Sequence, residues 1–174
     1  MMKRVLSHLS QNKQTVALVI VSLLLALSAF RLWADLRAFG NMASYTFSGL
    51  YTAFQTAANQ AEDQPYEFVG TQLYEDAYTE LFALDELART SLIFRRYAPG
   101  DSLRNFISWA SVEDDPAQQE KNLDCIAQIA GLLEPTWNLE PGYNYLGDPE
   151  GAAQVMEQVR ELARAAYPGG ASGA

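Results

Sequence analysis

An almost uninterrupted run of apolar residues occupies positions 16–33, and Arg31 is its only charged residue. At 1.5 Å per residue, a helix of this length is just long enough for the ~30 Å hydrocarbon layer of a membrane. Arg31 lies near the end of the run, where a long basic side chain can reach the lipid–water interface, and Trp33 suits the headgroup level. The pattern predicts a transmembrane signal anchor at residues 15–33, bound to the lipid bilayer.

A cleaved signal peptide is the alternative interpretation of the same run. It has a basic start, an apolar core, and the small residues Ala26 and Ser28, where cleavage would release a secreted domain. The positions beyond the run favour the anchor, because no proline occurs before Pro65 and an apolar stripe continues at spacings of three and four residues. We therefore expect one helix from Thr15 to Ala61, in which the anchor continues into the outer domain. The stripe consists of Leu32, Leu36, Phe39, Ala43, Phe47, Leu50, Phe54 and Ala58.

Basic residues near the two ends of the run predict its orientation. Lys3, Arg4 and Lys13 precede it, whereas Arg31 and Arg37 lie at or beyond its far end. An excess of basic residues favours the cytoplasmic side of a membrane. We expect a short cytoplasmic segment at residues 1–14, an extracytoplasmic domain at residues 34–167 and a flexible tail at residues 168–174.

Four further amphipathic segments predict helices in the outer domain, so the expected fold is all-α, a bundle of about five helices including the first. No segment alternates apolar and polar residues long enough to indicate a sheet. The segments lie at about residues 66–97, 102–112, from residue 116 onward, and from residue 149 to about 166. Their expected buried stripes are Leu73, Ala77, Leu81, Leu84, Ala88 and Leu92; Leu103, Phe106, Ile107 and Ala110; Leu123, Ile126, Ile129, Ala130 and Leu133; and Ala152, Val155, Met156, Val159, Leu162, Ala163 and Ala166.

Local signals at three of these segments predict where the helices begin. Asp101 or Ser102 can cap the third helix. Asp115 is the expected N-cap of the fourth, with proline at the first helical position and Gln118 at the capping-box position. Asp148 followed by Pro149 repeats this pattern before the fifth helix.

Charge and composition narrow the function. Of 12 basic residues, four precede position 34, whereas all 21 acidic residues follow it, so the outer domain carries 8 basic against 21 acidic groups, a net charge of −13. Such a surface repels nucleic acid. The single histidine, His8, precedes the apolar run, so the outer domain lacks the imidazole that nucleophilic triads and most catalytic zinc sites need. The single cysteine, Cys125, forms no metal or redox motif, and we expect it to be buried in a helix. We expect no cofactor and no metal site.

Aromatic and acidic residues gather between the fourth and fifth helices, at residues 134–151. Trp137, Glu140, Tyr143 and Tyr145 could form a site for a sugar, a peptide or a cationic ligand. The plainer interpretation is a lid, in which the aromatic side chains cover the end of the bundle.

A row of aromatic residues, Tyr74, Tyr78 and Phe82, widens the apolar face of the second helix. A core position is the plainer interpretation, but the row would become a partner-binding face if the bundle were too small to bury it.

The leading expectation is a membrane-anchored helical protein that acts by interaction or scaffolding at the cell envelope, with a membrane or envelope protein, or a second copy, as partner. The first alternative is a ligand-sensing or envelope-binding domain that uses the Trp137–Tyr145 loop. The second alternative is a hydrolase, in which two carboxylates would have to converge within ~5–10 Å. The sequence predicts that the protein is not an enzyme.

Overall fold

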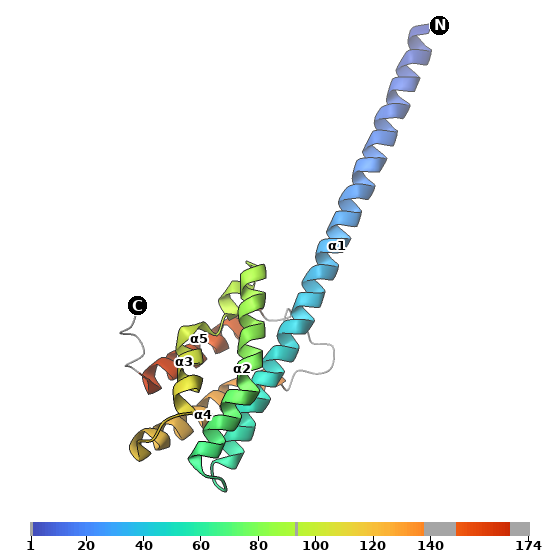
Figure 1. Cartoon of the computed structure of the whole chain (residues 1–174). Helices are drawn as coiled ribbons and strands as arrows, with labels where there is room; N and C mark the ends of the chain where they lie inside the picture. Colours follow the sequence, from blue (N-terminus) through green and yellow to red (C-terminus); the bar gives the residue numbers. More distant parts are fainter. Residues whose placement is uncertain (1, 93, 138–148, 168–174) are drawn as a thin grey trace. The chain divides into compact units, whose positions relative to one another are not determined.

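All regular structure in the described residues is helical. The computed structural model describes residues 2–92, 94–137 and 149–167 (Figure 1). Five α-helices confirm the predicted all-α fold within these ranges. The elements are α1 (Met2–Gln60), α2 (Tyr66–Thr90), the 3-10 helix η1 (Phe94–Tyr97), α3 (Gly100–Ala110), α4 (Pro116–Trp137) and α5 (Pro149–Ala166).

The chain divides into two compact units, Met1–Ala38 and Phe39–Ala174, and α1 contributes residues to both. In the first unit, every side chain from Thr15 to Trp33 is exposed. The helix is long and apolar enough to cross a membrane, judged by length and composition, and a signal sequence near the N-terminus would have the same properties.

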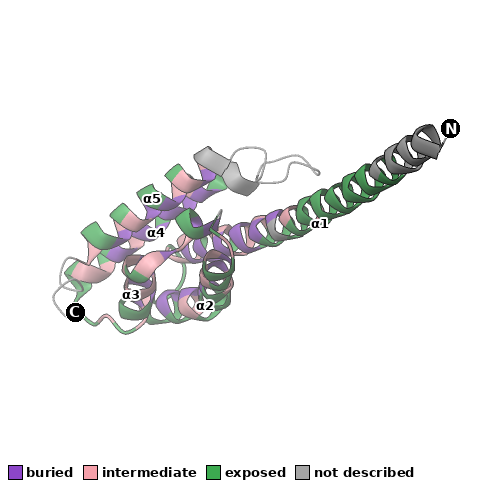
Figure 2. Cartoon of the chain, turned by 90° about the horizontal axis from the view of Figure 1, so that it is seen from above, coloured by how far each residue is buried: buried purple, intermediate pink, exposed green. Residues whose placement is uncertain are grey.

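The second unit has one apolar core that draws on all five helices and η1 (Figure 2). The predicted stripe of α1 is buried from Ala43 to Phe54 and partly buried at Ala58, whereas Leu32 is exposed. The stripes of the other helices are confirmed, apart from the end of the second. The largest fully buried side chains are Phe47, Leu50, Phe54, Leu73, Leu81, Leu84, Leu103, Phe106, Ile107, Ile126, Ile129 and Leu133.

The second helix is shorter than the sequence predicts. α2 ends at Thr90, because Ser91 takes an extended conformation (φ −139°, ψ 126°) and separates it from η1. After this break, the side chains of Phe94 and Tyr97 are buried. A continuous helix would have placed both side chains beyond the core. Leu92, predicted to be buried, lies in this turn and is exposed.

The predicted side-chain cap of α3 is wrong. The helix starts at Gly100, which has a positive φ of 69°, and no side chain caps it. Asp101 accepts a hydrogen bond from Arg104 at 2.7 Å instead. From α5, Arg160 donates to the carbonyl of Ala98 at 2.6 Å and so holds the end of the connection between η1 and α3.

The predicted start of α4 is confirmed. The side chain of Asp115 accepts a hydrogen bond from the backbone N–H of Ala117 at 3.1 Å, as an N-cap does. Gln118 does not complete a capping box, because its side-chain amide donates to Asn122 and to the carbonyl of Ala166 in α5. The side chain of Gln118 therefore contacts Asn122 and α5 and does not cap the start of α4.

Cys125 is buried on α4, as predicted. Burial raises the pKa of its thiol to about 12. The thiol is therefore protonated at neutral pH and is a poor nucleophile, because the thiolate is the reactive form.

Candidate functional site

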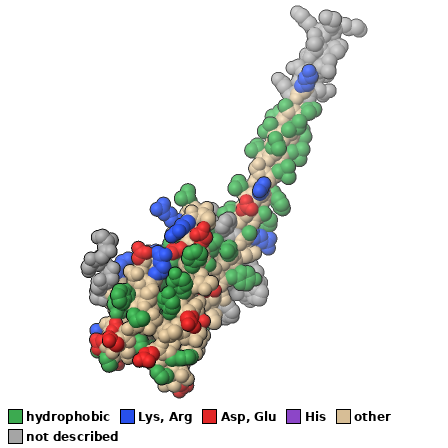
Figure 3. Space-filling view, in the orientation of Figure 1, with side chains coloured by type: hydrophobic (Ala, Val, Ile, Leu, Met, Phe, Trp, Pro, Cys, Tyr) green, Lys and Arg blue, Asp and Glu red, His purple; other side chains and the backbone are tan. Residues whose placement is uncertain are grey.

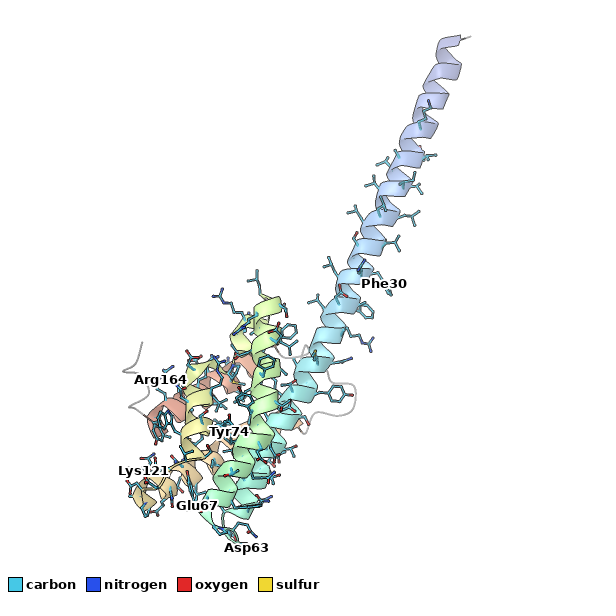
Figure 4. All side chains as sticks on the ribbon, viewed as in Figure 1. Phe30, Asp63, Glu67, Tyr74, Lys121 and Arg164 are labelled. Carbon is cyan, nitrogen blue, oxygen red and sulfur yellow. The ribbon has the colours of Figure 1, made fainter. Side chains whose placement is uncertain are left out.

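Four aromatic side chains of α2 form what we call the aromatic face: Phe68, Tyr74, Tyr78 and Phe82. Tyr74, labelled in Figure 4, packs against the core. Tyr78 is 52% exposed, Phe82 65% and Phe68 47%. The core interpretation of the row is therefore wrong for Tyr78 and Phe82, which lie at the surface.

The spacing of these residues aligns them along the helix. Phe68, Glu75 and Phe82 are seven residues apart, which is close to two turns of an α-helix. Tyr78 lies beside this line, and its ring centroid is 5.3 Å from that of Tyr74. The aromatic face therefore runs about 21 Å along α2, at 1.5 Å per residue. Phe68 is absent from the aromatic row predicted from the sequence, although its spacing of two heptads from Phe82 could have revealed it.

Acidic side chains surround the aromatic face. Glu67, Glu75, Asp76 and Glu86 are all exposed on α2, and the only basic residue of this helix is Arg89, in its last turn. Figure 3 shows hydrophobic and acidic side chains next to one another on the visible side of this unit, with basic side chains toward its upper end. The surface therefore combines apolar contact area with negative charge.

Two other carboxylates of α2 contact neighbouring helices. Glu80 lies over Gly49 of α1, and partial burial raises the pKa of its carboxyl group. Asp85 forms an ion pair with Arg104 of α3. These carboxylates therefore face the neighbouring helices α1 and α3.

A buried polar network ties α2, α4 and α5 together. Asn122, which is completely buried, donates to the hydroxyl of Tyr66 at 2.8 Å and accepts from Gln118 at 3.0 Å. Gln118 also donates to the carbonyl of Ala166 at 2.9 Å. Each of these side chains has a hydrogen-bonding partner, so the network supports the fold and offers no unpaired group to a ligand.

Tyr167 closes the same end of the bundle. Its hydroxyl donates to the carboxylate of Glu113, and its ring stacks on Trp109 with centroids 5.9 Å apart. The hydrogen bond lowers the pKa of Glu113 and raises the pKa of Tyr167 to about 12. This contact fastens the chain after α5 to the segment between α3 and α4.

The candidate loop is only partly within the described residues. Glu134 and Trp137, predicted to begin the loop, instead belong to the last turn of α4. Glu140, Tyr143 and Tyr145 lie outside the described residues, so both the ligand site and the lid stay predictions.

Metal-binding groups do not gather in the part of the chain that the structure describes. No set of three or more His, Cys, Asp or Glu side chains there could hold a metal ion. The chain matches no known protein family, no curated protein and no solved structure.

Proposed function

We propose that this chain is a single-pass membrane protein whose acidic helical bundle lies outside the cytoplasm and binds another protein through the aromatic face of α2. The exposure of Tyr78 and Phe82 carries the proposal. Large aromatic side chains are enriched at protein interfaces, and exposed apolar patches mark interaction sites. An interaction module needs such a surface and does not need a catalytic cluster.

The membrane part of the proposal rests on the exposed apolar helix and its ends. Arg37 lies over the ring of Trp33, 5.4 Å from the centroid, and Phe30 packs near the same ring at 5.9 Å. A cation with aromatic rings suits the lipid–water interface. Lys3 and Lys13 on the other side of the apolar run favour a cytoplasmic N-terminus.

We expect the chain to stay in the membrane with its N-terminus intact. Alkaline carbonate washing should leave it in the membrane pellet, and mass spectrometry should find residues 1–28. The protease accessibility of the bundle in intact cells checks its orientation. A soluble protein that begins near Ala29 would show that residues 1–28 are a cleaved signal peptide.

We expect a photoreactive phenylalanine analogue at position 82 to cross-link a protein in native membranes, because Phe82 is 65% exposed on the proposed face. The matched control carries the same analogue at Tyr45, which is 79% exposed on α1. A cross-link from position 82 but not from position 45 supports the interaction. Equal cross-linking from both positions, or from neither, would contradict a specific role for the aromatic face.

A further inference from the structure

We infer that the aromatic face of α2 binds a cationic amphipathic helix of another protein, which extends the proposed function by stating the chemistry of the partner.

The aromatic face favours a helical partner. Phe68 and Phe82 lie on one line about 21 Å long, with Tyr78 beside it, so the face is a ridge of about four helical turns. A second helix can place residues at positions i, i+3, i+4 and i+7 along such a ridge. An extended segment would instead need free backbone groups, and the backbone of α2 uses its own in helical hydrogen bonds.

The charges around the ridge favour a cationic partner. Glu67, Glu75, Asp76 and Glu86 flank the aromatic side chains, and Arg89 is the one basic residue on this helix. Lysine or arginine side chains beside the apolar stripe of a partner can pair with these carboxylates. The same cations can also lie over the exposed rings of Tyr78 and Phe82.

The same charges argue against two other partners for the aromatic face, a second copy of this chain and a lipid surface. In a symmetric antiparallel pair centred on this line, Glu75 would face Glu75, with Phe68 opposite Phe82. In a parallel pair in register, Glu75 of one chain would again face Glu75 of the other. Like charges that face each other across an interface are unfavourable, and anionic headgroups would be repelled in the same way.

Two synthetic helical peptides test the inference. They share one apolar stripe and differ only in the flanking residues, which are Lys and Arg in one and Glu in the other. The full chain is held in nanodiscs of zwitterionic lipid, so that the cationic peptide has no anionic lipid to bind. We expect fluorescence anisotropy to show binding of the cationic peptide, with an affinity at least about tenfold higher than that of the anionic peptide.

Variants of the chain locate the binding surface. We expect Phe82→Ala to weaken binding of the cationic peptide about tenfold, because a large aromatic side chain that a partner buries is a typical interface hot spot. Glu75→Gln should weaken it less and should reduce its salt dependence. Tyr45→Ala is the matched control and should leave the affinity unchanged. A melting temperature of Phe82→Ala within a few degrees of the unsubstituted chain, well above the assay temperature, shows that the loss is not caused by unfolding.

Several outcomes would overturn the inference: binding of neither peptide, equal binding of both, or binding that Phe82→Ala leaves unchanged. The segment that is cross-linked from position 82 separates this inference from the proposed function. A cationic helix there supports both. An anionic or neutral segment, or a second copy of this chain, refutes the cationic partner and leaves the interaction itself standing. No cross-link at all refutes both.

Discussion

Leu81→Ala is expected to destabilise the second unit strongly. Leu81 is 1% exposed and belongs to the apolar core of this unit. Truncation removes buried apolar contacts and leaves a cavity that the surrounding side chains fill only in part, at a cost of about 2–5 kcal/mol. The melting temperature of the full chain in detergent, followed by near-ultraviolet circular dichroism, should fall by on the order of 10 °C.

Phe82→Ala is the matched control, one residue further along the same helix. Its side chain is 65% exposed, so its truncation should change the melting temperature by only a few degrees. The two variants together separate the role of α2 in the fold from its role at the surface. If Leu81→Ala and Phe82→Ala lowered stability equally, the assignment of the buried and exposed sides of α2 would be wrong.

Gly70→Ala is expected to push α2 and α3 apart. A β-carbon at position 70 would lie 2.7 Å from the carbonyl oxygen of Ala110 and 3.2 Å from the α-carbon of Ser111. Both are backbone atoms, so no side-chain rotation can relieve the overlap. We expect a loss of about 1–3 kcal/mol, which denaturant titration of the full chain can measure.

Gly131→Ala provides the control for Gly70→Ala. Gly131 lies on the exposed side of α4, and a β-carbon there would have no neighbour within 4 Å. Alanine is the better helix former, so this variant should gain about 0.5–1 kcal/mol. A loss of stability in both variants would point to a general effect of the substitution and not to the contact between α2 and α3.

The elements that the sequence predicted well depend on local interactions. The start of α4 follows from Asp115 and Pro116, because an N-cap needs only the next two or three residues. The buried stripes follow from the helical period, which places Leu81 and Val159 in the core without knowledge of their neighbours.

The elements that the sequence predicted poorly depend on distant contacts. The end of α2 at Thr90 lets Phe94 and Tyr97 reach the core. No interaction within α2 itself encodes the burial of these two side chains. For the same reason, the helical period put the aromatic row on the apolar side of α2. Only the positions of the other helices decide that Tyr74 is packed while Phe82 is not.

The buried amide of Asn122 and its partners favour one alignment of α2, α4 and α5 along their axes. The stripe of α5 contains several alanines, whose small side chains let helices approach closely but distinguish poorly between one alignment and the next. The hydrogen bonds from Asn122 to Tyr66, and through Gln118 to Ala166, can all form in one alignment only. A shift of one turn between α2 and α4 would leave the buried amide nitrogen of Asn122 unpaired, which is costly in an apolar interior, and a shift of α5 would break the hydrogen bond from Gln118. The network therefore contributes to the uniqueness of the fold: Asn122 opposes a shift between α2 and α4, and Gln118 opposes the shifts that the alanine-rich stripe of α5 would otherwise tolerate.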